Sequence, residues 1–318
     1  MLKQAIEIYE LLDSARIDGE QVAARFLGMG LRDVTVEKVA GAQGSTDFVK
    51  LRIIGRRGRT NGGDAPTLGI IGQLGGIGAR PAQTGLVSDG DGALCALTCA
   101  LKLTEMQKHG DILDGDVIVV THICPNAPTQ PHDPVPFMGS PIGIGPAMDK
   151  SVLPEMEAIL SVDTTRGNRV INHRGFAISP TAKQGYILRI ADDLLDLMTN
   201  VTGRLPVVLP ITTQDITPYG NRLYHINSIM QPATATPAPV VGVAITAEAA
   251  VPGSATGATH IVDIEAAARF CIEVAKAYGK GNCRFYDPAE WELIQRTYGS
   301  LEHLQKGGYH DVGAIEDE

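Results

Sequence analysis

The sequence has no run of about eighteen apolar residues, the length that a membrane-spanning helix needs, and no N-terminal segment with a small-residue cleavage site. It also has little positive charge. The formal net charge is −9, and no block of lysine or arginine occurs beyond the short cluster of Arg56, Arg57 and Arg59. These absences argue against a membrane or a nucleic acid as a partner and favour a cytoplasmic protein.

Cysteine is also scarce, and its spacing matches no known pattern. The five cysteines form no CxxC pair and are odd in number, which fits reduced thiols better than a disulfide framework. Most of them are expected to lie in the core. Three binding motifs are absent as well: a GxGxxG that opens a helix, a GxxxxGK[ST] phosphate loop and a GxSxG nucleophile elbow. Dinucleotide binding and a serine nucleophile are therefore disfavoured.

What the sequence does contain is a series of nearly continuous apolar runs separated by helical patterns. The runs occupy residues 67–74, 116–123, 157–164, 207–213 and 238–246, and the helical patterns occupy residues 92–108, 184–200 and 263–279. Continuous apolar runs are typical of strands that are buried on both faces. Their alternation with helices predicts a single α/β domain over residues 1–318, with a mostly parallel central sheet and helices on both faces.

The flanking segments have different patterns. Two short helices are expected within residues 1–30, and residues 34–40 and 47–55 alternate like the strands of a β-hairpin. A helical tail is expected over residues 283–318. The stretch 125–146 is rich in proline and glycine, and its length favours a functional loop over a simple connection.

Polar residues gather just after the apolar runs, where open α/β sheets bind their ligands. Asp89 and Asp91 precede the helix at 92–108, and Asp163 ends the run 157–164. Asp91 is expected to cap that helix, whereas Asp89 is either a turn residue or a ligand. A carboxylate at the position of Asp163 would be costly if it stayed buried and unpaired, so we expect Arg166 or a cation to pair with it.

The order of these segments resembles that of the zinc-dependent aminopeptidase and deacetylase clan, over roughly residues 30–280. The clan has a strand that ends in Gly-His, a bridging Asp before a small-residue helix, a strand that ends in Glu-Glu, a strand that ends in Asp, and a final His. In the same order this chain has GIIGQL, SDGDGALCALTCALKL, LDGDVIVVTHICPN, ILSVDTTRG and VGVAITAEAAVPG. The resemblance implies a zinc-aminopeptidase-like fold. The chain resembles more closely a bacterial family catalogued only as a domain of unknown function.

Residue by residue, the resemblance implies that Asp89 is the bridging aspartate and Asp163 is the aspartate of the second metal. The other matching positions have lost their ligands and hold Gln73, Pro125, Asn126 and Gly253. An ordinary two-zinc site is therefore not expected, because each zinc ion in such a site is coordinated by three or four N, S or carboxylate ligands. Two carboxylates without imidazoles suit Mg²⁺, Mn²⁺ or a substrate ammonium better.

A relocated metal site is the alternative. His122 and Cys124 lie two apart on a strand end and so face the same side, which suits a soft divalent ion. His132 and Asp133 in the following loop could complete a set that binds a single zinc ion. The competing interpretation is that His122 and Cys124 simply pack at a strand end.

Four further residues are candidates for substrate binding. Arg80 or Arg166 could pair with a substrate carboxylate, and Gln73 and Asn126 could supply hydrogen bonds where the clan has metal ligands. The sequence thus predicts a divergent aminopeptidase-like hydrolase for a small amide-containing or amino-acid-like substrate, with Asp89 and Asp163 as catalytic residues. The alternative is a non-catalytic small-molecule binding or assembly protein on the same scaffold. Either could form a homo-oligomer, for which the terminal helices are candidate surfaces.

Overall fold

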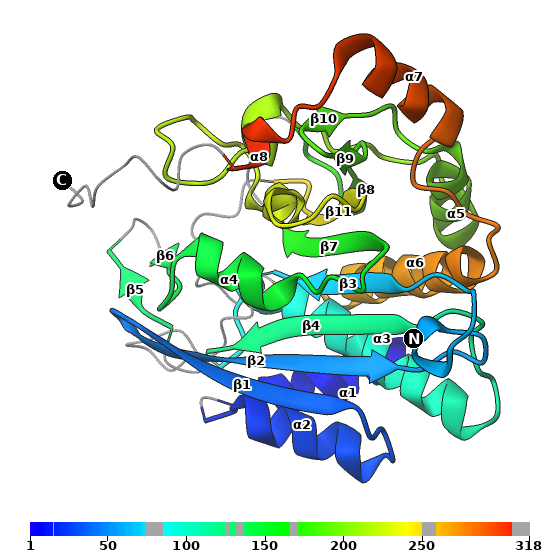
Figure 1. The fold of residues 1–318 in the computed structure, drawn as a ribbon. Coiled ribbons are helices and arrows are strands. Elements are labelled where there is room, and N and C mark those ends of the chain that lie inside the picture. Colours follow the sequence, from blue (N-terminus) through cyan, green and yellow to red (C-terminus); the bar gives the residue numbers. More distant parts are fainter. Residues whose placement is uncertain are drawn as a thin grey trace.

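The computed structural model describes residues 1–14, 16–73, 85–124, 127–131, 137–165, 171–249 and 259–306. Within these residues the main sheet has nine strands, and six of them follow one another in the order β1, β2, β4, β3, β7, β11 (Figure 1). These six are β1 (Val34–Gly41), β2 (Gly44–Ile53), β4 (Val117–Ile123), β3 (Leu68–Gly72), β7 (Ala158–Thr164) and β11 (Val240–Thr246). The other three are β8 (Gly175–Ile178), β9 (Ala182–Lys183) and β10 (Tyr186–Ile187), which pair with β11 or with each other.

The four central strands, β4, β3, β7 and β11, are parallel to one another. Their carboxyl ends therefore lie at one edge of the sheet. Antiparallel strands border this centre on both sides, because the hairpin of β1 and β2 pairs with β4, and β8 and β9 pair with β11. The predicted α/β class with a parallel central sheet and the predicted hairpin are thus confirmed.

Alternate residues of the central strands enter two different hydrophobic cores. Ile70 and Val119 belong to the core on one face of the sheet, whereas Ile71 and Val120 belong to the core on the other. Since consecutive side chains of a strand point to opposite faces, a strand that is covered on both faces needs apolar residues at every position. This is the physical reason for the continuous apolar runs.

Helices cover both faces of the sheet (Figure 1). On one face lie α1 (Leu2–Leu12), α3 (Asp91–Lys108) and α6 (Ile261–Gly279), with α2 (Gly19–Gly28) on β1 and α5 (Asp192–Thr202) on α6. On the other face lie α4 (Ile144–Ser151) and the 3-10 turns η3 (Thr213–Ile216) and η4 (Ser228–Thr234). The remaining elements are α7 (Pro288–Tyr298), α8 (His303–Lys306), η1 (Arg59–Asn61), η2 (Ser88–Gly90), β5 (Thr129–Gln130) and β6 (Phe137–Met138). Among the described helices, none is both long and apolar enough to cross a membrane.

Two predicted elements differ from the structure. Residues 207–213 form no named strand and make only one bridge, from Val208 to Ile178. Pro210 lacks the N–H group that a longer ladder would need. The helix expected over residues 184–200 begins only at Asp192, because Gln184 and Gly185 take positive φ angles of 46° and 82° in the turn between β9 and β10.

Candidate acidic site

The N-terminus of α3 lies directly on the carboxyl ends of two parallel strands. A Cβ atom on Gly92 would lie 2.6 Å from the carbonyl oxygens of Gln73 and Val162, and one on Gly72 would lie 2.5 Å from the carbonyl oxygen of Gly92. Only glycine permits so close an approach of the backbones. These two glycines therefore hold η2 and the first turn of α3, and with them Asp89 and Asp91, against the end of the sheet.

Three carboxylates are buried at this position. Asp89 comes from η2, Asp91 from the first turn of α3 and Asp163 from the end of β7, and each is at most 6% exposed. Burial raises the pKa of Asp89 well above its usual range, and the charges of Asp163 and Asp91 raise it further. Removal of a carboxylate from water and its placement near other negative charges both disfavour the ionised form.

Among the described residues, Asp163 finds only partial compensation for its burial. One of its oxygens accepts a hydrogen bond from the backbone N–H of Thr164 at 2.7 Å, and the other accepts one from the Ser228 hydroxyl at 3.1 Å. Burial raises the pKa of Asp163 to about 7, although these two hydrogen bonds act in the opposite direction. Asp163 therefore changes its charge near neutral pH.

Ser228 connects Asp163 to a tyrosine. Burial raises the pKa of Tyr219 to about 12, with further contributions from the charges of Asp163 and Asp215, while a hydrogen bond with Ser228 lowers it. The ring of Tyr219 stacks on that of His225, with 4.4 Å between their centroids. Ser228 and Tyr219 could not be identified from the sequence, because they follow no apolar run and no local pattern links them to Asp163.

Asp91 does not have the predicted role of helix cap. The N-cap of α3 is Gly90, and no side chain caps this helix end. Asp91 is instead the first residue of α3, and its carboxylate accepts a hydrogen bond of 2.7 Å from the hydroxyl of Thr259, which is 168 residues away in the chain. The helix follows η2 directly and starts at Asp91, one residue earlier than it would if Asp91 were its cap.

Gln73 lies at the end of β3, as predicted, but its side chain is engaged in packing. Its amide nitrogen donates a hydrogen bond to the Ser161 hydroxyl at 3.3 Å and lies 3.7 Å from the sulfur of Met148. The residue is 5% exposed. The amide thus fills a polar position in the core below the strand ends.

His122 also has a packing role. Its ring stacks on Phe48, with centroids 5.1 Å apart, and its Nδ1 atom lies 2.8 Å from the hydroxyl of Thr46. The Thr46 hydroxyl donates its proton to the carbonyl oxygen of Ile123. Its oxygen therefore accepts a hydrogen bond from Nδ1 of His122, which carries the ring proton. Burial lowers the pKa of His122 to about 4, which keeps the imidazole neutral. Cys124 packs in a different cluster, with Val87, Ala127 and Met138.

The relocated zinc site has no support within the described residues. Neither His122 nor Cys124 belongs there to a group of three or more potential ligands, and neither do Asp89 and Asp163. The remaining predicted residues, Arg80, Asn126, His132, Asp133 and Arg166, lie outside the described part of the chain. Within that part, no lysine or arginine forms an ion pair with Asp89 or Asp163.

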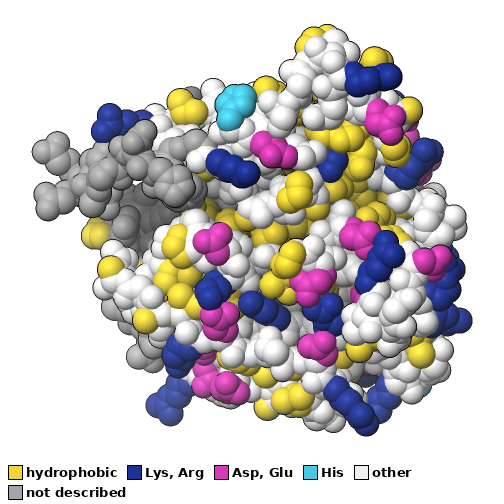
Figure 2. Space-filling model, in the orientation of Figure 1, with side chains coloured by type: hydrophobic (Ala, Val, Ile, Leu, Met, Phe, Trp, Pro, Cys, Tyr) yellow, Lys and Arg dark blue, Asp and Glu magenta, His cyan; other side chains and the backbone are white. Residues whose placement is uncertain are grey.

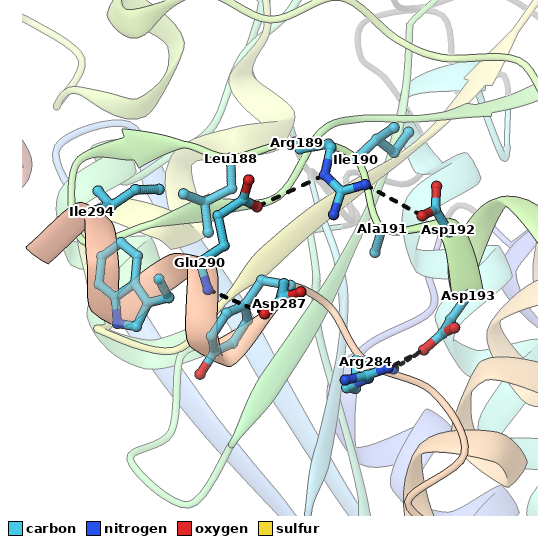
Figure 3. Close-up of a pocket in the computed structure, with 12 residues that line it drawn as sticks. Leu188, Arg189, Ile190, Ala191, Asp192, Asp193, Arg284, Asp287, Glu290 and Ile294 are labelled. Carbon is cyan, nitrogen blue, oxygen red and sulfur yellow. Dashed lines mark hydrogen bonds and ion pairs between the residues drawn. The ribbon is translucent and has the colours of Figure 1, made fainter.

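Elsewhere on the described surface, many charged side chains form ion pairs, such as Arg57 with Asp64 and Arg59 with Glu157. Basic and acidic side chains are interspersed over the face shown in Figure 2. A small cavity of about 110 Å³ between α7 and the segment before α5 is likewise lined by both basic and acidic side chains (Figure 3). There Arg189 contacts Asp192 and Glu290, and Arg284 contacts Asp193. Each of these two arginines thus has an acidic partner, whereas no lysine or arginine of the described residues pairs with Asp89 or Asp163.

Fold and site together define an α/β protein with buried carboxylates at the carboxyl ends of its parallel strands. The chain belongs to the family described as "Protein of unknown function (DUF1177)", whose model matches residues 37–308. This confirms the resemblance to a domain-of-unknown-function family. No curated protein matches the chain in sequence.

Among solved structures, the chain is similar to the bottromycin maturation enzyme BotP. The identity is 14% and the TM-score 0.50, over 87% of this chain and 70% of that chain. A structure of the same enzyme in complex with Mn matches at 14% identity with a TM-score of 0.48, over 87% of this chain and 71% of that chain. At this identity the likeness concerns the fold alone.

Proposed function

We propose that this protein is a divergent aminopeptidase-like hydrolase that acts on a small amide-containing or amino-acid-like substrate. Asp89 and Asp163 would hold a hard divalent cation, Mg²⁺ or Mn²⁺, or the ammonium group of the substrate. The proposal is supported by the order of segments that resembles the zinc-dependent aminopeptidase and deacetylase clan, in which Asp89 and Asp163 match two metal ligands. It is also supported by the fold, which places both residues at the carboxyl edge of the parallel strands.

The observation that carries the proposal is the pair of buried, incompletely compensated carboxylates. Among the described residues, none donates a hydrogen bond to the side chain of Asp89, and Asp163 accepts only two. An ionised carboxylate in such surroundings is costly unless a positive charge accompanies it. A bound cation or ammonium would supply that charge and would let both groups ionise at neutral pH.

The residues at the site fit zinc poorly. Within the described residues, neither carboxylate belongs to a group of three or more potential metal ligands, whereas zinc in proteins usually has three or four N, S or carboxylate ligands. Carboxylate oxygens are the ligands that Mg²⁺ and Mn²⁺ prefer. In the absence of a cation, the pKa of about 7 would also let Asp163 accept or donate a proton as a general base or acid.

A second candidate function is non-catalytic binding of an amino-acid-like molecule. It is favoured by Gln73, which stands where the clan has its first His and whose amide is engaged by Ser161 and Met148 rather than by the carboxylates. A protein that lost its metals would retain the ammonium-binding carboxylates but not turnover. Binding without hydrolysis would distinguish this candidate from the first.

Metal binding is tested by titration of the chelator-treated protein with Mn²⁺, Mg²⁺ and Zn²⁺ in a calorimeter. We expect binding of Mn²⁺ or Mg²⁺ that is lost in Asp89→Asn and in Asp163→Asn and retained in the control Asp196→Asn, whose side chain is exposed on α5. Protein purified without chelator should contain well under two zinc ions per chain. Two tightly held zinc ions would contradict the proposed site.

Activity is tested with aminoacyl anilides, dipeptides and N-acylated amino acids, each with added Mn²⁺, Mg²⁺ or Zn²⁺. We expect no hydrolysis of simple aminoacyl anilides in the presence of zinc, and turnover of one of the other classes that Asp163→Asn abolishes. If no class is hydrolysed but free amino acids bind to the wild type and not to Asp89→Asn, the binding function replaces the hydrolase.

A further inference from the structure

A cluster of three cysteines lies in the core between α3 and α6, outside the acidic site. Cys95 and Cys99 are one turn apart on α3, and Cys271 lies on α6, which packs beside α3 (Figure 1). The three sulfur atoms all lie within 4.8 Å of one another. All three residues are fully buried and carry free thiols. They can therefore contact one small ion at the same time.

The ligand type restricts the ion to a soft one. Thiolates select thiophilic ions over Mg²⁺ or Mn²⁺. Within the described residues no histidine or carboxylate joins the three sulfurs, so the group offers three ligands and not the four that structural zinc sites use. The cluster thus favours an ion whose usual coordination is by three sulfur atoms.

The charge of the complex restricts the ion further. Three thiolates with a monovalent ion leave two negative charges in the core, and with a divalent ion they leave one. A trivalent ion leaves none. No lysine or arginine is among the buried residues of the described chain, so the core offers no basic side chain to offset a residual charge. A buried charge without a partner is strongly disfavoured.

We propose that Cys95, Cys99 and Cys271 form a binding site for one soft trivalent ion of the arsenic class, taken up as its uncharged trihydroxide. Three As–S bonds replace three As–O bonds. Each thiol proton leaves with one hydroxide, so that three waters are released and arsenic stays trivalent. Neutral reactants give a neutral complex. Free thiolates are not required, which matters because burial raises the pKa of the Cys99 thiol.

The position of the cluster predicts slow uptake. All three sulfurs are shielded by the core, so α3 and α6 must separate transiently before the trihydroxide reaches them. Uptake should therefore accelerate in urea at concentrations that leave the protein folded. Once formed, the three bonds join the two helices and should raise the melting temperature.

The test uses the full chain, reduced with a phosphine, and sodium arsenite as the probe. Mass spectrometry should show one adduct that has gained arsenic and lost three hydrogens, since a two-thiol adduct would retain a hydroxyl group. Alkylation after denaturation should then modify Cys124 and Cys283 but not the three cluster cysteines. Zn²⁺ added in place of arsenite should leave all five cysteines reactive.

Matched variants locate the site. Cys95→Ala, Cys99→Ala and Cys271→Ala should each lose the three-thiol adduct, whereas Cys124→Ala and Cys283→Ala, which alter buried cysteines outside the cluster, should retain it. The alkylation pattern of the wild type decides the question even if a cluster variant fails to fold. An adduct that forms only after unfolding, or protection by Zn²⁺ and not by arsenite, would overturn the proposal.

Discussion

Asp215 and Asp163 are both buried aspartates, but their surroundings differ. The carboxylate of Asp215 accepts hydrogen bonds from the backbone N–H groups of Thr212, Ile226 and Asn227 and from the Thr212 hydroxyl. From the described residues, the carboxylate of Asp163 accepts only two hydrogen bonds and that of Asp89 accepts none. Asp215 is thus a structural anchor that holds the loop before η4, next to Asp163.

Burial alone therefore does not mark a functional carboxylate. A buried carboxylate whose oxygens are fully hydrogen-bonded is compensated within the fold and stabilises it. One that lacks donors and lies near other negative charges is destabilising unless a proton, a cation or a ligand accompanies it. With respect to the described residues, Asp89 and Asp163 are of this second kind, which is why we propose the function there.

The largest effect is expected from loss of the anchor. Asp215→Ala removes the acceptor of three backbone donors and one hydroxyl, some of them buried, and should lower the free energy of unfolding by about 4 kcal/mol or more. Urea denaturation of the variant and of the exposed control Asp196→Ala measures this. The structural role of Asp215 is refuted by a variant as stable as the control.

The pH dependence of stability should distinguish Asp163. Its folded-state pKa of about 7 lies above the unfolded value, so protonation stabilises the fold at low pH and this contribution is lost as the pH rises through about 7. The variant Asp163→Asn has no ionisable group at this position. Its stability relative to wild type should therefore increase by about 3 kcal/mol between pH 4 and pH 8, measured by urea denaturation. His122 titrates in both proteins, so its contribution cancels in the difference between them. If the difference in the free energy of unfolding between wild type and Asp163→Asn does not change with pH, the pKa of Asp163 is not raised in the folded state.

The glycine at the start of α3 offers a test of the site's geometry. Gly92→Ala places a methyl group 2.6 Å from two backbone carbonyl oxygens, so the helix must shift away from the strands, at a cost of about 2 kcal/mol. The shift should also displace Asp89 and weaken cation binding. Gly28→Ala, where a Cβ would meet nothing within 4 Å, is the control. Equal melting temperatures and equal Mn²⁺ affinities for the two variants would argue against this contact.

The smallest effect is expected for Asp91. Because it accepts a hydrogen bond from Thr259 and does not cap α3, Asp91→Ala should lower stability by about 1 kcal/mol, and Thr259→Val should lower it similarly. In a double-mutant cycle the two losses should not add. Additive losses would mean that the two side chains act independently and that the role of Asp91 lies elsewhere.

Much of the fold and part of the site could be predicted from the sequence. The runs at 67–74, 116–123, 157–164 and 238–246 correspond to the parallel strands β3, β4, β7 and β11. Strand ends in such sheets converge, so Asp89 and Asp163 could be expected to lie together. The strand predicted at 207–213 was wrong, because the apolar composition of the run does not show that Pro210 interrupts the pairing.

The α/β class follows from the order of residues alone, since burial on two faces demands apolar residues at every strand position. The positions of Asp89 and Asp163 after those strands likewise single them out. The partners of these residues depend instead on how the elements pack in three dimensions. The partner of Asp91 lies 168 residues away and the Ser228 partner of Asp163 lies 65 residues away. Cys271 likewise meets Cys95 and Cys99 across two helices. Contacts of this kind arise from the packing of whole elements, and no local pattern of residues encodes them.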